Sequence, residues 1–92
     1  MSKPSPNEVE QTFAVLDNSE QMVLRLRSGL VDGHRHTLRE VGAFLGTTRA
    51  AVRSLEWQGW QKLQAHAQND RSASRSVYYI LGRCRTKKPK MN

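Results

Sequence analysis

The sequence predicts a small all-α protein, a helix-turn-helix bundle of about four to five helices. Its 92 residues, 37% of them hydrophobic, make one domain with a modest core. The main signal lies in residues 37–63, where two apolar patterns of helical period are separated by Gly46. Residues 74–83 also permit a strand, but a single strand has no partner, so we favour a short helix there.

Residues 1–7 contain two prolines and two serines and have little to bury, so we expect a disordered N-terminal lead. A first short helix follows from Glu8. Its apolar residues Val9, Phe13 and Leu16 recur at spacings of three and four, which places them on one face. The folded domain is therefore expected to begin at residue 8.

A second helix is predicted to begin at about Asn18. Asp17 and Glu20 have the three-residue spacing of a capping box, in which each satisfies a backbone N–H of the other. Gly29 is expected to end this helix. The Asp-Gly pair within residues 31–36 indicates a turn, and its length suits a connection between helices.

The third helix and the turn after it begin the helix-turn-helix. Gly46 suits a helix C-terminus, because glycine adopts the left-handed conformation at little steric cost. Thr47 and Thr48 are candidate N-caps for the next helix. The apolar residues of the third helix again recur at spacings of three and four: Leu38, Val41 and Leu45.

The fourth helix carries the same period together with two arginines. Arg49 and Arg53 lie four residues apart and therefore share one side. The second helix of such a motif enters the DNA major groove with its N-terminal residues towards the bases. Its apolar stripe is formed by Val52, Leu55, Gly59 and Leu63.

The pattern is lost after Leu63, where Asn, Asp and Ser cluster. Residues 64–75 are read either as a loop or as the frayed end of the fourth helix. The short helix at residues 74–83 closes the domain, which spans residues 8–83. Residues 84–92 are predicted to form a flexible basic tail that begins with Cys84.

The net charge of +7 indicates a polyanionic partner. Residues 1–24 carry one lysine and four acidic residues, whereas residues 25–92 carry fourteen Lys or Arg and four acidic residues. This asymmetry suits a domain that turns one side to nucleic acid and the other to a protein. With no membrane-spanning apolar run and no signal peptide, we expect a cytoplasmic protein.

Catalytic and metal sites are not expected. Cys84 is the single cysteine, and His34, His36 and His66 do not have the spacing of zinc ligands. The sequence contains no nucleophile with an adjacent base, no paired carboxylates and no phosphate-binding loop. We therefore predict a protein that is not an enzyme and that has no cofactor and no small-molecule substrate.

Two blocks of the sequence resemble region 4 of bacterial primary-type sigma factors. Residues 16–30, LDNSEQMVLRLRSGL, resemble the first half of that region, and residues 37–63 resemble the second half. The segment SRSVYYIL resembles the short helix that closes the family domain. The second block keeps these positions in register with the family pattern: Thr37, Leu38, Glu40, Val41, Gly42, Thr48, Arg49, Val52, Arg53, Leu55, Glu56, Lys62 and Leu63.

The resemblance implies a domain that recognises the upstream promoter hexamer, the −35 element, and docks on the flap of the RNA polymerase β subunit. The chain has no room for the other sigma regions, so we expect an accessory transcription factor, bacterial or phage-encoded. Its partners would be double-stranded promoter DNA and either RNA polymerase or a sigma factor. The alternative is an adaptor or inhibitor that keeps the fold and does not read DNA specifically.

The resemblance also implies which residues contact DNA. Arg49 and Arg53 match family positions that contact bases and phosphates, although a solvated helix face would look the same in sequence. Thr48 would cap the helix and contact a phosphate. The remaining candidates for contact with the DNA are Ser54, Arg25, Arg27 and Arg39.

The chain departs from the family pattern at several sites. Ala50 and Ala51 replace a charged pair, and Ser54 replaces a glutamine, which shortens three potential DNA contacts. These changes predict either a looser or different DNA site than that of a primary sigma factor, or a domain that hardly reads DNA. Three residues are assigned to protein contact: Ser28, Leu30 and Trp57. Ser28 replaces an aromatic residue near the flap-binding surface, and Trp57 lies near the polar face of its helix. Trp60 is expected to complete the core.

Overall fold

The computed structural model describes residues 3–30 and 33–84, and within them it contains five α-helices, a short 3-10 turn and no strand. The predicted all-α class is confirmed. The elements are α1 (Pro6–Phe13), α2 (Asn18–Ser28), α3 (Leu38–Leu45), α4 (Arg49–Asn69), the 3-10 turn η1 (Arg71–Ala73) and α5 (Ser74–Cys84).

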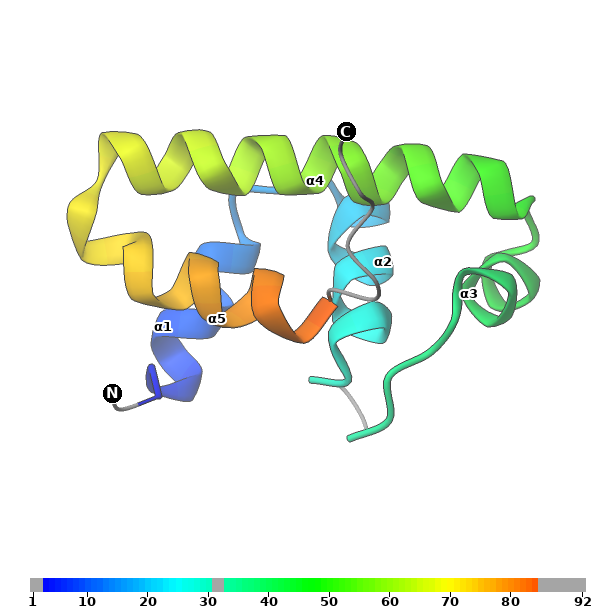
Figure 1. The fold of residues 1–92 in the computed structure, drawn as a ribbon, viewed down its shortest axis with the longest axis horizontal. Helices are drawn as coiled ribbons and strands as arrows, with labels where there is room; N and C mark the ends of the chain where they lie inside the picture. Colours follow the sequence, from blue (N-terminus) through cyan, green and yellow to red (C-terminus); the bar gives the residue numbers. More distant parts are fainter. Residues whose placement is uncertain (1–2, 31–32, 85–92) are drawn as a thin grey trace, which may run out of the picture.

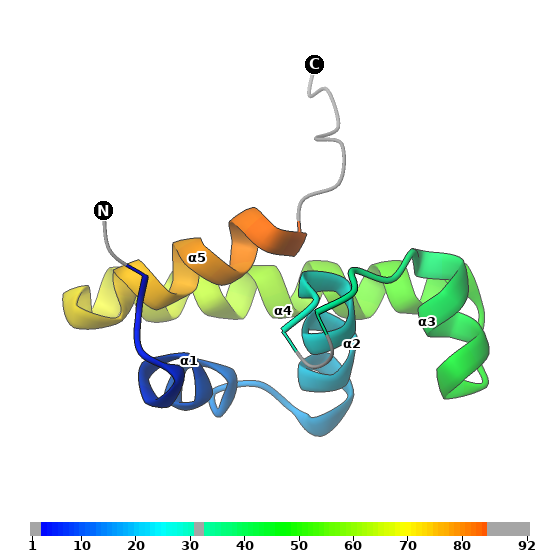
Figure 2. The same cartoon turned by 90° about the horizontal axis from the view of Figure 1, so that it is seen from below.

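Helix α4 is the long axis of the molecule, and the other helices lie along one side of it (Figure 1). Helix α2 crosses the middle of α4, while α3 lies at the N-terminal end of α4. Helices α1 and α5 lie together towards the other end, and the turned view gives the same order (Figure 2). Among the described residues, no helix combines the length and apolar character that a membrane span requires.

The first helix begins earlier than the sequence pattern predicts. The backbone N–H of Ser5 donates to Glu8 Oε1 at 2.8 Å, and the N–H of Glu8 donates to Ser5 Oγ at 3.2 Å, which forms a capping box. Pro6 occupies the first helical position, where its missing N–H costs nothing. Pro4 is buried. The expected disorder of residues 1–7 is therefore wrong for residues 4–7, and residues 1–2 lie outside the described part.

The C-terminal half also differs from the predicted boundaries. Helix α4 continues to Asn69, so most of the segment read as a loop or frayed end is helical. Asp70 then ends it, and its Oδ1 accepts from Ser72 N at 3.1 Å and from Ser72 Oγ at 2.6 Å. The short last helix is confirmed, but it includes Cys84, which is buried and does not belong to a tail. Residues 85–92, predicted to be flexible, lie outside the described residues.

The core lies between α4 and the helices along its side. The predicted inward residues of the first helix are buried, and so are those of the helix-turn-helix stripe except Leu38, Leu45 and Leu55, which are partly exposed. Trp60 packs against this core with part of its side chain exposed. The residues of lowest exposure in the core are Phe13, Val23, Leu24, Val41, Val52, Leu63, Val77 and Ile80.

A buried ion pair joins α2 to α4. Arg27 Nε donates to Glu56 Oε2 at 2.7 Å, and both side chains are more than nine-tenths buried. Arg27 Nη1 also donates to the carbonyl oxygen of His36 at 3.0 Å, in the connector between α2 and α3. One guanidinium therefore fixes two helices and the connector. Because both charged groups are buried away from water, removing either one would leave the other without a partner.

Replacing one member of this pair is expected to destabilise the fold strongly. Arg27→Met leaves the Glu56 carboxylate buried without its partner, which should lower the free energy of unfolding by about 3–5 kcal/mol. The double change Arg27→Met with Glu56→Leu removes both charges and should recover most of that loss. Urea unfolding of the three proteins measures the difference.

The matched control is the exposed pair of Glu10 with Arg25, in which the Glu10 side chain is 60% exposed. Glu10→Gln should cost no more than about 1 kcal/mol, because exposed ion pairs contribute little. If Arg27→Met were no more destabilising than Glu10→Gln, the buried pair would not hold α2 against α4.

Candidate nucleic-acid interface

A tight turn sets the angle between α3 and α4. Gly46 ends α3 in the left-handed conformation, with φ of 72°, as predicted. The N–H of Thr47 donates to the carbonyl oxygen of Gly42 at 2.8 Å, so the turn folds back on α3. A β-carbon at Gly42 would lie 2.9 Å from the Thr47 carbonyl oxygen. The close approach of the two helices therefore requires glycine at position 42.

Both helices of the motif are capped by threonines. The N–H of Ala51 donates to Thr48 Oγ1 at 3.0 Å, which confirms Thr48 as the N-cap of α4. At the start of α3, the N–H of Glu40 donates to Thr37 Oγ1 at 3.1 Å and the N–H of Thr37 donates to Glu40 Oε1 at 2.9 Å. The Thr37 hydrogen bonds lower the pKa of the Glu40 carboxyl. Both helix starts are thus fixed locally.

The first turns of α4 present two arginines to solvent. Arg49 is the first residue of the helix and Arg53 lies one turn further, about 6 Å along the axis. Neither guanidinium forms an ion pair or hydrogen bond within residues 3–30 and 33–84. Ser54 is exposed beside Arg53, and Arg39 is exposed on α3. The α3–α4 unit thus brings the predicted DNA contacts on these two helices to one end of the molecule.

The two arginines predicted on α2 have other roles. Arg27 is 6% exposed and fully engaged inside the protein, so the prediction that it contacts DNA is wrong. Arg25 binds both carboxylate oxygens of Glu10, at 2.8 and 2.9 Å, and its guanidinium lies 4.4 Å from the centre of the Phe13 ring. The hydrogen bond to Glu10 raises the pKa of Arg25. Arg25 therefore joins α1 to α2 instead of facing DNA.

The three residues predicted to contact a protein differ in how far they are exposed. Ser28 is fully buried, its Oγ donates to the carbonyl oxygen of Arg25 at 3.1 Å, and its own carbonyl accepts from Arg83 Nε at 2.8 Å. The assignment of Ser28 to a protein contact is therefore wrong. Leu30 is partly buried against the core. Trp57 is 55% exposed on α4, so it remains a prediction for a protein contact.

Two further aromatic residues are exposed, and of these the sequence patterns above do not indicate Phe44. Phe44 is 68% exposed on α3 and Tyr78 is 59% exposed on α5. Phe44 is one of the apolar residues of α3, but it lies outside the stripe formed by Leu38, Val41 and Leu45. That offset is the signal that finds it, because an apolar residue outside the inward stripe faces solvent.

Cys84 does not have the environment of a reactive thiol. Burial, together with the nearby Glu56 carboxylate, raises the pKa of the Cys84 thiol to about 12. Nucleophilic cysteines have a lowered pKa and partial exposure, which is the opposite arrangement. Its packing against the Leu24 carbonyl oxygen, at 3.7 Å from Sγ, gives Cys84 a place in the core.

Comparison with known proteins gives consistent matches. Residues 12–65, more than half of the chain, match the sequence model of the family described as Sigma-70, region 4. The matched range includes α2, α3, the turn and most of α4. The chain is also 41% identical over 61 residues to a protein of Synechococcus elongatus named RNA polymerase sigma factor SigA4. The match covers 66% of this chain and 20% of that relative.

Adding a β-carbon at Gly42 is expected to force the turn away from α3. The clash with the Thr47 carbonyl should cost about 1–3 kcal/mol in Gly42→Ala, partly offset by up to about 1 kcal/mol from the better helix propensity of alanine. The control is Gly82→Ala, since nothing lies within 4 Å of a β-carbon at Gly82. Urea unfolding should show destabilisation in the first variant and a neutral or stabilising effect in the second. Equal stability of the two variants would contradict the close approach.

Proposed function

This chain belongs to the sigma-70 region 4 family, and we propose that it regulates transcription by binding −35-type promoter DNA and engaging bacterial RNA polymerase. Family membership supports the general part of this proposal, a sigma-like role connected with DNA and RNA polymerase. The Synechococcus elongatus relative is named as an RNA polymerase sigma factor, and we extend that association to this chain. The proposed role is one of binding and involves no catalysis.

The observation that carries the DNA-binding part is the cationic start of α4. Arg49 and Arg53 are exposed on consecutive turns, with no acidic partner within residues 3–30 and 33–84. A recognition helix enters the major groove by its N-terminal turns, and an arginine there can bind guanine O6 and N7 together. The proposal therefore assigns base contacts to Arg49 and Arg53.

Contacts to the DNA backbone would surround these arginines. The N-terminus of α4 has a positive helix dipole and backbone N–H groups, of which that of Ala51 already donates to Thr48 Oγ1, and a helix start of this kind favours a phosphate. Thr48 and Ser54 bring hydroxyl groups to the same turns, and exposed Arg39 adds a cation from α3. Such contacts fix the register of the domain on the duplex and make its binding sensitive to salt.

The polymerase-binding part of the proposal rests on exposed aromatic surface. Trp57 lies one turn beyond Arg53 on α4, and its ring is in edge contact with Trp60 at a centroid distance of 6.5 Å. Exposed tryptophan is common at the energetic centre of protein interfaces. We assign Trp57, with partly buried Leu30, to the contact with the β flap.

An adaptor that keeps the fold without reading DNA is the second candidate. The observation that favours it is the exposed Ala50, next to Ala51, on the DNA-facing turns of α4. Alanine can touch a thymine methyl group but cannot form a hydrogen bond to a base. In this second reading, α4 would act on polymerase or on a sigma factor through Trp57 alone.

The two candidates make different predictions for Arg49→Ala and Arg53→Ala. If the arginines read bases, each change should weaken binding to a −35-type duplex by about tenfold to one hundredfold, equivalent to roughly 1–3 kcal/mol. For an arginine that contacts phosphate, the slope of log affinity against log salt should also decrease by about one. Fluorescence anisotropy with a labelled duplex, at several salt concentrations, measures both quantities.

Arg71→Ala and Arg75→Ala are the matched controls, because each removes an equal charge from an exposed site on η1 or at the start of α5, beyond the C-terminal end of α4. DNA binding that falls equally in all four variants would contradict a specific interface at α4. Retention of RNA polymerase in a pull-down, with no DNA binding by the unaltered protein, would favour the adaptor. In that case, Trp57→Ala should abolish the pull-down.

A further inference from the structure

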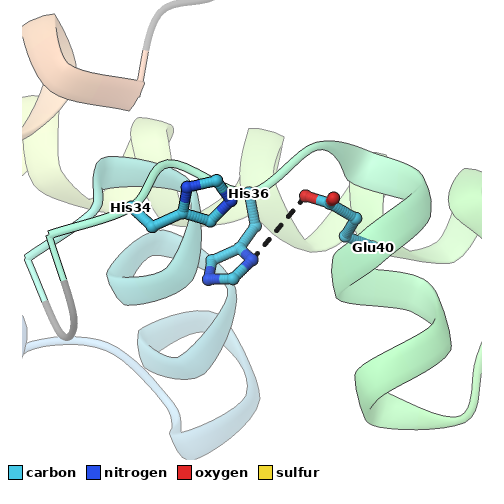
Figure 3. Close-up of side chains that lie close together, drawn as sticks. All are labelled: His34, His36 and Glu40. Carbon is cyan, nitrogen blue, oxygen red and sulfur yellow. Dashed lines mark ion pairs between the residues drawn. The ribbon is translucent and has the colours of Figure 1, made fainter.

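Three side chains with metal-binding atoms converge where the connector meets α3 (Figure 3). His34 and His36 come from the connector, and Glu40 comes from the first turn of α3. One nitrogen or oxygen atom of each residue lies within 4.8 Å of those of the other two. His36 Nδ1 is 3.7 Å from Glu40 Oε1, and the two imidazole rings meet edge to face at a centroid distance of 4.6 Å.

The connector that carries the histidines is held by the core. The N–H of His36 donates to the Leu26 carbonyl oxygen at 3.0 Å, and the His36 carbonyl accepts from the buried Arg27 guanidinium at 3.0 Å. Arg35, between the two histidines, donates from Nη1 to the Arg83 carbonyl oxygen at 3.1 Å. Contacts with α2 and α5 therefore hold the connector that carries the two imidazoles.

The third group is held equally well. Glu40 Oε1 accepts the N–H of Thr37, which orients the carboxylate at the N-terminus of α3. A carboxylate has two oxygens and several lone pairs, so this hydrogen bond leaves acceptor positions for a metal ion. The carboxylate on α3 and the connector backbone that carries the imidazoles are thus held by different contacts.

We propose that His34, His36 and Glu40 bind one divalent transition-metal ion of the zinc type. Two imidazole nitrogens and one carboxylate oxygen form a recurrent ligand set for zinc, with water in the remaining position. Ligand atoms at about 2.0–2.2 Å from zinc lie roughly 3.3 Å apart, so the longer separations must shorten by small rotations of the side chains. His34 and Glu40 are exposed, so these rotations meet no core packing.

The site revises the expectation that the chain has no metal centre. That expectation considered only the spacing of the histidines, whereas the third ligand is a glutamate on the following helix. The ion would link the connector directly to α3, the first helix of the helix-turn-helix. Binding of the ion does not depend on the DNA contacts proposed for Arg49 and Arg53. The site has three protein ligands and is exposed to water, so its affinity for zinc should be lower than that of a closed four-ligand zinc site.

Isothermal titration calorimetry of the full chain with zinc chloride tests the site. The protein must lack a histidine tag. One zinc ion should bind per chain, and His36→Ala should weaken the binding by more than about tenfold. Glu40→Gln is the sharper variant, because glutamine also serves in a capping box and so preserves the start of α3 while removing the anionic ligand. It should weaken zinc binding comparably without changing the urea midpoint.

His66→Ala is the matched control, because His66 lies on α4 outside the cluster. Its zinc affinity should equal that of the unaltered protein. An affinity unchanged by His36→Ala and Glu40→Gln, or reduced equally by His66→Ala, would overturn the site. So would a stoichiometry of one zinc per two chains with a dimer in sedimentation, which would place the ligands on different molecules.

Discussion

The buried ion pair between Arg27 and Glu56 is the interaction on which the arrangement of this domain depends. It joins α2 to the middle of α4, and through the His36 carbonyl it also fixes the connector that leads into α3. Near it, α4 approaches α2 so closely that a β-carbon at Gly59 would lie 3.0 Å from Leu24 Cδ1. The position of the helix-turn-helix relative to the rest of the domain follows from these contacts.

The same packing separates the charges of the chain by function. Acidic residues of the N-terminal part form ion pairs with other residues of the domain: Glu10 binds Arg25, and Glu20 accepts from Lys62 Nζ at 2.9 Å. Arg49 and Arg53 have no such partner within residues 3–30 and 33–84. The exposed side chains of Arg39, Arg49 and Arg53 therefore give the α3–α4 end of the molecule a cationic surface, which a DNA-binding helix requires.

Local signals predicted the helices well, whereas long-range contacts could not be read from the sequence. The ends at Gly29 and Gly46 and the cap at Thr48 depend on residues within one turn, and all three were found. The burial of Arg27 is not visible in the sequence because its partner, Glu56, lies 29 residues away. The same holds for Ser28, whose carbonyl oxygen accepts from Arg83 on α5. The sequence likewise does not show that Glu40 lies close to the two histidines, because this depends on the path of the connector in space.

We propose that the start of α4, with the exposed side of α3, is the surface that meets DNA. Chemical-shift mapping of the nitrogen-15-labelled protein, titrated with a duplex that carries a −35-type hexamer, is the sharpest test of this surface. The largest shifts should fall in residues 47–54 and around Arg39, with α1 and α5 little affected. Largest shifts on α1 and α5, or no shifts at low salt, would contradict it.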